Sequence, residues 1–240
     1  PPDHHGLPAA AARAREILED LYRPLYLLST PFVWTNWETA ELIKYASNAF
    51  LATKITFINQ MANLAEAVGA DVHAVAKTMG MDGRISPKFL HPGPGYGGSC
   101  FPKDTKAVAA TGDRYGVDMS LIKAVVNGNE AQKRRSASKV LRLLTGDPHG
   151  MATGRTVAIL GVAFKAETDD IRESPAISIV RELLGAGARI RVHDPKALPA
   201  FRAMFGDAVT YCESEFTALE GAHAAVIVTE WNEYRNLDLP

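Results

Sequence analysis

The sequence has 240 residues, of which 47% are hydrophobic and 22% charged, and its 26 basic and 27 acidic side chains give a formal net charge of −1. This balance gives no reason to expect a nucleic-acid or membrane-surface partner, and no apolar run approaches the roughly 20 residues that span a bilayer. The composition is that of a globular protein with enough residues for one large domain or two smaller ones.

The cysteines and histidines predict neither a disulfide nor a metal site. Cys100 and Cys212 lie far apart in the sequence and form no paired motif, which favours a reducing, cytoplasmic setting. The seven histidines show no metal-ligand spacing. We therefore expect a cytoplasmic protein that holds no metal.

The first part of the chain has helical periodicity. A short helix is predicted over about 9–22, followed by an extended stretch over 26–33. The sequence TNWE has the form of a capping box, in which the Thr35 hydroxyl accepts the Glu38 amide. Apolar residues then recur at helical spacing up to Gly69, which predicts a helix of about 30 residues. Such a long helix suits a spine or a dimer interface.

Three further helices are predicted before the composition changes. Asp71 caps a short helix that ends at Gly80, and two longer ones cover about 103–115 and 118–144. Gly128 in the last helix costs about 1 kcal/mol relative to alanine, but the pattern continues through it.

An α/β pattern follows the linker sequence Gly146-Asp147-Pro148. Residues 156–164 form a fully apolar strand of the buried, parallel type. Residues 189–193 and 224–229 are further strands, and Ser174-Pro175 begins the helix between the first two. Strand, helix and strand at this spacing are typical of a doubly wound sheet.

Three domain regions are therefore predicted. Residues 1–34 have the character of the end of an earlier domain. Residues 35–145 form an all-α middle domain with a long spine helix. Residues 151–240 form an incomplete α/β domain that is Rossmann-like and doubly wound.

The loop GPGYGGSCFPKD at 93–104 is the most informative segment. It contains GxGxxG, but it lies between two predicted helices instead of within a βαβ unit, so we reject a dinucleotide fingerprint. Cys100 precedes Pro102, which places its sulfur near a helix N-terminus, where the dipole and Lys103 favour a thiolate. Asp104 follows one turn later. A buried structural cysteine in a tight turn explains these residues equally well.

Two other sets of polar residues attract attention. Lys44 and Asn48 share one face of the spine helix, and packing around Lys44 could bury it in part, although a surface lysine beside an asparagine is the simpler interpretation. Phe164 and Lys165 follow the first strand at the sheet edge where ligands bind in such folds, and Arg172 near the next helix is a plausible anion ligand. A solvated charged loop explains the second set equally well.

Taken together, the Lys44–Asn48 pair, the glycine-rich loop with Cys100, and the segment from Phe164 to Arg172 resemble the UDP-glucose 6-dehydrogenase family, within the wider nucleotide-sugar 6-dehydrogenases. The resemblance covers nearly the whole chain from about residue 13. The matching segments are TAELIKYASNAFLATKITFINQ, GYGGSCFPKDTKA, ILGVAFKAETDDIRESPAISIV, HDPKA and VTEWNEY.

The resemblance implies a two-step oxidation of the sugar C6 alcohol to a carboxylate with two NAD+. Cys100 would form a thiohemiacetal and then a thioester. Lys44 and Asn48 would act on the C6 oxygen or a water, and Asp104 on the hydrolytic water. The implied substrate-binding residues are Arg84 (from a partner subunit), Phe89, Gly95, Tyr96, Gly97, Phe164 and Lys165, and Lys103 and Arg172 would approach the NAD phosphates.

The sequence departs from the family pattern at its ends. It contains no strand–GxGxxG–helix unit and no counterpart of the family's hydrolytic glutamate or final substrate-binding arginine. We therefore expect a fragment without the N-terminal NAD-binding domain and without the end of the C-terminal domain, inactive by itself. UDP-glucose and a homodimer partner through the helix at 36–68 are the expected binding partners.

Other functions stay open. A related enzyme acting on GDP-mannose or a UDP-N-acetylhexosamine is the alternative within the enzyme class, and FPKD with DDIRESPA favours UDP-glucose. A noncatalytic nucleotide-binding or dimerisation module would also suit the long helix. A thiol hydrolase is disfavoured because no histidine lies near Cys100 in the sequence.

Overall fold

The structure, a computed structural model, describes residues 9–25 and 32–237. The chain divides into two compact units, residues 1–43 and 44–240. The first unit contains α1 (Ala9–Tyr22), η1 (Arg23–Leu25) and the first turns of α2. The helix predicted over 9–22 is confirmed, whereas most of the extended stretch predicted over 26–33 lies outside the described residues.

The predicted spine helix is present as α2 (Trp37–Val68), which is 32 residues long. Its cap differs from the prediction, because Asn36 Oδ1 accepts the Thr39 amide at 2.9 Å. Asparagine caps as well as threonine does, and the helix begins one residue later than a Thr35 cap requires. The predicted Thr35–Glu38 capping box is therefore wrong.

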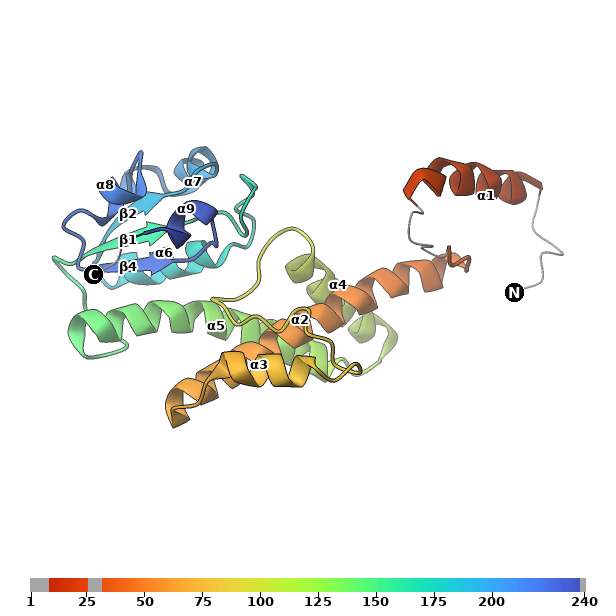
Figure 1. The fold of residues 1–240 in the computed structure, drawn as a ribbon, viewed down its shortest axis with the longest axis horizontal. Coiled ribbons are helices and arrows are strands. Elements are labelled where there is room, and N and C mark those ends of the chain that lie inside the picture. Colours follow the sequence, from red (N-terminus) through yellow and green to blue (C-terminus); the bar gives the residue numbers. More distant parts are fainter. Residues whose placement is uncertain (1–8, 26–31, 238–240) are drawn as a thin grey trace. The chain divides into compact units, whose positions relative to one another are not determined.

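The rest of the helical domain consists of α3 (Val72–Gly80), α4 (Phe101–Tyr115) and α5 (Ser120–Thr145), arranged around α2 (Figure 1). Asp71 caps α3 as predicted. Helix α5 continues through Gly128, where a Cβ would lie 2.8 Å from Thr56 Cγ2. The glycine thus permits close contact between α2 and α5. In the described part of the chain, none of the helices has the length and apolar character needed to cross a membrane.

The second domain contains a four-stranded sheet in the order β3-β2-β1-β4, with every neighbouring pair parallel. The strands are β1 (Thr156–Leu160), β2 (Arg189–His193), β3 (Thr210–Tyr211) and β4 (Ala224–Ile227). Leu160 pairs with both His193 and Ile227, so the carboxyl ends of the three longer strands meet at one edge. Ligands of doubly wound folds bind at this edge.

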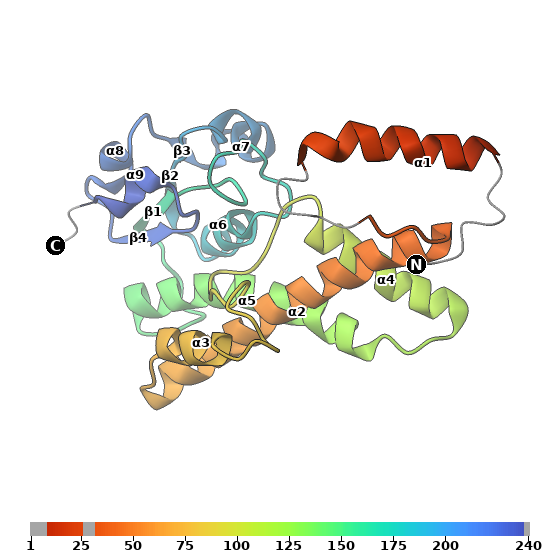
Figure 2. The same cartoon turned by 45° about the vertical axis from the view of Figure 1, so that its right-hand side comes forward.

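Helices cover both faces of the sheet (Figure 2). One face carries α6 (Pro175–Gly185), whose N-cap is Ser174 as predicted. The other face carries α7 (Leu198–Phe205) and α8 (Glu215–Leu219), and the remaining elements are η2 (Gly206–Ala208) and α9 (Asn232–Arg235). The predicted fold class, a helical domain with a long helix followed by a parallel α/β domain, is confirmed.

Two strands are shorter than predicted. The segment predicted as a strand over 156–164 leaves the sheet at Gly161, whose φ is +87° and whose Cβ position lies 2.5 Å from Thr229 Cβ. The strand predicted over 224–229 ends at Ile227. Beyond it, the Thr229 hydroxyl donates to the Ala163 carbonyl at 2.6 Å. Val162 and Ala163 after Gly161 are buried and apolar, and Val228 extends the apolar run after β4, so hydrophobicity alone overestimates strand length.

Helix α5 joins the helical domain to the α/β domain. Ala137, Val140 and Leu141 in its second half belong to the hydrophobic core that β1 and α6 form. In both views α5 runs along α6, and the two helices are in contact (Figures 1 and 2). Residues on α5 and on the loops of the α/β domain can therefore meet at the glycine-rich loop.

Candidate active site

Cys100 occupies the N-cap position of α4 and is exposed. Pro102 lies in the first turn of the helix, where a backbone N–H has no acceptor within the helix, so the N–H that proline lacks is not missed. The Cys100 carbonyl accepts the Asp104 amide at 2.8 Å and so closes the first turn of the helix. The predicted location of Cys100 at a helix N-terminus is confirmed.

Asp104 is the centre of a polar cluster beside this cysteine. Its side chain is only 2% exposed. It accepts hydrogen bonds from Asn48 Nδ2 at 2.5 Å and from Lys44 Nζ at 3.2 Å, both of α2. Lys103 Nζ lies 3.1 Å from its other oxygen. The structure therefore brings together three of the four residues predicted to be catalytic, one turn from the fourth.

The cluster keeps Asp104 ionised. Burial alone would raise the pKa of this carboxyl, but the hydrogen bonds from Asn48, Lys103 and Lys44 outweigh it and hold the pKa below its usual value of 3.8. A buried carboxylate with two cationic neighbours can accept a hydrogen bond from a water or hold a lysine in position.

Lys44 itself is not buried. Its side chain is 60% exposed, so the simpler interpretation of the sequence, a surface lysine, is confirmed, and the possible partial burial is not found. The ammonium group reaches Asp104 from a surface position. It is consequently available to a molecule that approaches Cys100 from solvent.

The glycine-rich loop packs against residues 171–174 of the α/β domain. The Gly98 amide donates to the Arg172 carbonyl at 2.8 Å. A Cβ at Gly97 would lie 2.5 Å from the Glu173 carbonyl oxygen, and one at Gly98 would lie 2.7 Å from the ring of Phe164. Gly97 and Gly98 are thus needed for the close approach of the loop to residues of the α/β domain.

A cavity of about 560 Å³ lies beside this loop. It is lined by four of the seven predicted substrate-binding residues, Phe89, Gly95, Tyr96 and Phe164. Lys165 lies close by, with its Nζ 5.5 Å from the centre of the Phe164 ring. Aromatic faces beside a few polar groups suit a small organic molecule with a planar ring.

Arg84 is not brought to this cavity. It lies in the segment after α3, where its guanidinium makes a two-pronged hydrogen bond with Asp82, and its side chain is 90% exposed. Within the described part of the chain, Arg84 makes no hydrogen bond or ion pair with the other predicted site residues. Its assignment to a partner subunit's site stays a prediction.

A second cavity, of about 690 Å³, contains both residues predicted to approach a cofactor, Lys103 and Arg172, next to Ser99. Arg172 makes a two-pronged hydrogen bond with Asp170, which is the main cause of its raised pKa, and the nearby Cys100 makes a smaller contribution. Lys103 is engaged by Asp104. Both cations therefore have carboxylate partners that an anionic ligand would have to share.

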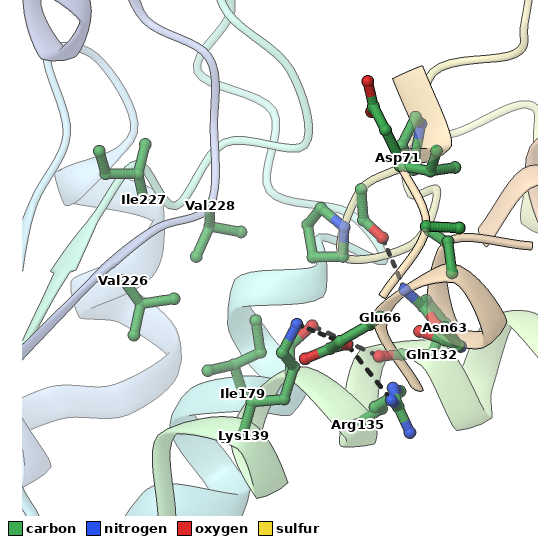
Figure 3. Close-up of a pocket in the computed structure, with 18 residues that line it drawn as sticks. Asn63, Glu66, Asp71, Gln132, Arg135, Lys139, Ile179, Val226, Ile227 and Val228 are labelled. Carbon is green, nitrogen blue, oxygen red and sulfur yellow. Dashed lines mark hydrogen bonds and ion pairs between the residues drawn. The ribbon is translucent and has the colours of Figure 1, made fainter. Parts of the chain in front are cut away.

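A third cavity, of about 590 Å³, lies between the end of α2, helix α5 and strand β4. Figure 3 shows Glu66 between Arg135 and Lys139 on one side of this cavity and Val226, Ile227 and Val228 on the other. None of the predicted site residues lines it. It is therefore separate from the region around Cys100.

Comparison with known families decides what kind of protein this is. Residues 38–131 match the profile of the "UDP-glucose/GDP-mannose dehydrogenase family, central domain", and residues 158–240 match that family's "UDP binding domain". The chain belongs to the UDP-glucose/GDP-mannose dehydrogenase family. The gap between the two matches, residues 132–157, contains the end of α5 and the linker sequence at 146–148.

Individual relatives within the UDP-glucose/GDP-mannose dehydrogenase family agree. The chain is 47% identical over 233 residues to a UDP-glucose 6-dehydrogenase of Rhizobium meliloti, covering 97% of this chain and 52% of the relative. It is 44% identical to the Bacillus subtilis UDP-glucose 6-dehydrogenase TuaD, covering 95% and 48%. A UDP-glucose dehydrogenase structure from Pyrobaculum islandicum superposes with a TM-score of 0.86 at 41% identity, covering 95% and 51%. The chain thus spans about half the length of the relatives it matches.

Sequence reasoning missed residues that hold the glycine-rich loop of this family member. Asn129 of α5 accepts the Tyr96 amide at 2.8 Å and donates to the Tyr96 carbonyl at 3.0 Å. Asn59 of α2 accepts the Gly93 amide at 2.7 Å. Both asparagines are nearly fully buried in helices. A polar residue at a buried helical position was the available signal, but its partner lies more than 30 residues away.

Proposed function

We propose that this chain carries the covalent and nucleotide-sugar-binding part of a UDP-glucose 6-dehydrogenase. The observation that supports this most is the cluster of Lys44, Asn48 and Asp104 beside Cys100, an exposed thiol at a helix N-terminus. Relatives at 44–47% identity carry that enzyme name. The family assignment alone would leave the role of each residue open.

In the proposed reaction, the Cys100 sulfur attacks the C6 aldehyde of the sugar, and the oxygen becomes the hydroxyl of a thiohemiacetal. Loss of a hydride from C6 and a proton from this hydroxyl gives a thioester. Water then attacks the thioester carbon, releasing the carboxylate and the Cys100 thiol. The covalent stages divide one difficult oxidation into easier steps.

The polar cluster acts on the oxygens of this sequence. Lys44, exposed and anchored by Asp104, stabilises negative charge on the C6 oxygen and takes part in proton transfer. Asn48 orients that oxygen or a water. Asp104, kept ionised by its neighbours, accepts a hydrogen bond from the water that hydrolyses the thioester.

The cavity lined by Phe89 and Phe164 is the proposed binding site for UDP-glucose. Phe164 offers its ring to the base, and Lys165 beside it offers a cation to a phosphate or hydroxyl. The backbone of Gly95–Gly97 lines the sugar. Arg84 reaches the sugar of a partner subunit, since in its own chain it contacts only Asp82 among the described residues.

NAD, when bound, would supply the hydride acceptor for the oxidation of the alcohol to the aldehyde and for that of the thiohemiacetal to the thioester. The residues of the larger cavity fit its phosphates, because Lys103 and Arg172 are cations that line one hollow beside Ser99. Their role is to bind and orient the pyrophosphate. Among the described residues, the GxGxxG sequence at 93–98 lies between two helices, and no strand–GxGxxG–helix unit is present for the rest of the dinucleotide. We therefore propose that the chain by itself binds the sugar nucleotide but does not reduce NAD+.

A second copy of the chain is the proposed partner. Phe50, Phe57 and Leu64 of α2 are 64%, 41% and 55% exposed and recur every seven residues, which puts them on one stripe of the helix. An apolar stripe of this kind is expected to be covered. Phe57→Glu should shift sedimentation from dimer to monomer, and an unchanged dimer would reject this surface.

We also propose that the protein is located in the cytoplasm.

The substrate test is calorimetric titration of the chain with UDP-glucose, GDP-mannose and a UDP-N-acetylhexosamine. UDP-glucose should bind most tightly. A preference for GDP-mannose would favour the other enzyme of the family name, and binding of none would leave a dimerisation module as the better explanation. Reaction at Cys100 is tested separately: the C6 aldehyde of UDP-glucose should protect Cys100 from iodoacetamide more strongly than UDP-glucose itself does, as measured by mass spectrometry.

A further inference from the structure

A buried lysine lies beneath the glycine-rich loop and has no role in the reaction outlined above. Lys133 of α5 has a side chain that is 2% exposed. Its ammonium group lies 2.8 Å from Glu130 Oε1 of the same helix and 3.5 Å from Glu173 Oε2 of the α/β domain. Fully buried lysines are uncommon and require partners. Lys133 has one carboxylate partner in the helical domain, Glu130, and one in the α/β domain, Glu173.

The stem of Lys133 contacts the loop directly. A Cβ built at Gly95 would lie 3.1 Å from Lys133 Cγ and 3.0 Å from Asn129 Oδ1. Asn129, one turn earlier on α5, makes two hydrogen bonds with the backbone of Tyr96. Helix α5 therefore supports one side of the loop through two buried side chains four residues apart.

Glu173 supports the opposite side. Its carbonyl oxygen faces Gly97, at 2.5 Å from the Cβ position, and the preceding carbonyl, of Arg172, accepts the Gly98 amide at 2.8 Å. Glu173 has a φ of +54°, an uncommon conformation for a residue with a side chain. Such conformations persist where surrounding contacts fix them. Here the contacts are the ion pairs to Lys133 and to Lys106, at 3.1 Å.

The charge state of Glu173 is consistent with this role. Its partial burial would raise the pKa of the carboxyl, but the hydrogen bond and charge of Lys106 and the charge of Lys133 outweigh this and lower it. The two lysines thus favour the carboxylate form of Glu173. The two charges join α5 to the segment that carries Arg172, with the loop between them.

We infer that Lys133 is a positioning residue of the site, which acts through Glu173 to hold residues 95–98 in the conformation that presents Cys100 and Arg172. This inference rests on the proposed function, because it assigns that loop to the binding of the sugar nucleotide. Replacing the lysine removes one side of the ion pair and leaves Glu130 and Glu173 facing each other without a cation between them. The loop then loses support from both sides.

Hydrogen exchange in the full chain tests the positioning without any need for catalysis. In Lys133→Met, the amides of residues 97–99 should exchange at least about tenfold faster, while β1 and the second half of α5 keep their protection. Lys133→Arg should restore the wild-type rate. Lys123→Met removes a surface ion pair between α4 and α5 and should leave the loop unchanged.

Affinity for UDP-glucose gives the second measurement. The dissociation constant should rise about tenfold in Lys133→Met and in Glu173→Gln, and combining the two should add little, since they break the same pair. Loop exchange that is unchanged in both variants, or that rises equally in the sheet, would overturn the inference. If the wild-type chain fails to bind UDP-glucose but the exchange results hold, the proposed function fails and the positioning stands. If Lys133→Met fails to fold, the loop exchange and UDP-glucose affinity of Glu173→Gln test the inference in its place.

Discussion

Asn48 on α2 and Asp104 on α4 are joined by a hydrogen bond of 2.5 Å between Nδ2 and Oδ2, although 56 residues separate them in the sequence. The bond ties the long helix to the first turn of the helix that begins at Cys100. Since Asp104 is buried, its carboxylate depends on such donors to remain ionised. The site is therefore held by the same polar contacts that are proposed to act on the substrate.

The Asp104→Asn substitution should destabilise the chain by about 2 kcal/mol, the scale of a hydrogen bond to a charged group. The amide can accept from Asn48 or Lys44 but provides no charge to pair with the two lysines. Urea denaturation measures the loss. Asp113→Asn is the matched control, because Asp113 pairs with Lys123 on the surface and should change stability by less than about 0.5 kcal/mol. Equal effects of the two substitutions would contradict the importance of the cluster.

The pH dependence of this difference has a defined sign. The folded-state pKa of Asp104 lies below 3.8 because donors outweigh the opposing effect of burial. The carboxylate therefore stabilises the fold above that pH, and the contribution is lost as the pH falls through the lowered pKa. The stability gap between wild type and Asp104→Asn should be constant from about pH 5 to 7 and should narrow below pH 3.8. A gap that widens in acid would mean that the folded state prefers the neutral carboxyl.

The two cysteines should differ strongly in reactivity. Cys100 is exposed at a helix N-terminus, whereas Cys212 is buried, and burial raises the pKa of its thiol. Iodoacetamide at neutral pH should modify Cys100 at least about a hundredfold faster. The fast phase should disappear in Cys100→Ser and persist in Cys212→Ser. Modification of Cys100 should leave the affinity for UDP-glucose mostly unchanged, since no part of the proposed nucleotide site depends on the sulfur.

Regular local structure was predictable from the sequence. The bounds of α3, α6 and β2 and the continuity of α5 through Gly128 follow from caps, prolines and periodicity. The end of β1 was overestimated because Val162 and Ala163 after the turn at Gly161 are buried and apolar, and the end of β4 was overestimated by two residues, Val228 and Thr229. The two-residue strand β3 and the short helices α7, α8 and α9 were missed, since elements of eight residues or fewer carry little periodic signal.

The site was predictable where neighbours in sequence are neighbours in space. Cys100 and Asp104 share one helical turn, so their relationship could be seen directly. The pairing of Lys133 with Glu173 could not, because it depends on α5 packing against the α/β domain. The exposure of Lys44 agrees with the simpler interpretation of the sequence, but the sequence left partial burial open, since burial at a helix position depends on what the rest of the chain covers.

Gly97 should tolerate no side chain. In Gly97→Ala the new Cβ would lie 2.5 Å from the Glu173 carbonyl oxygen, which is backbone and cannot rotate away. The loop would separate from residues 171–174, with an expected loss of about 1–3 kcal/mol in stability and weaker binding of UDP-glucose. In Gly83→Ala the new methyl group has nothing within 4 Å, so stability and binding should both stay at the wild-type level. Thermal unfolding and calorimetry of the two variants measure these effects, and a fully stable Gly97→Ala would show that the loop contact is unimportant.

Phe164 connects the α/β domain to both the loop and the cavity. Its ring lies against Gly98 and lines the cavity that also contains Phe89 and Tyr96. If it stacks on the base, Phe164→Ala should weaken the binding of UDP-glucose and of UDP alone by a similar factor, about 1–3 kcal/mol in each case. Phe216→Ala is the control, because Phe216 is 67% exposed and remote from the cavity lining. A loss for UDP-glucose without a loss for UDP would mean that Phe164 contacts the sugar and that the base binds elsewhere.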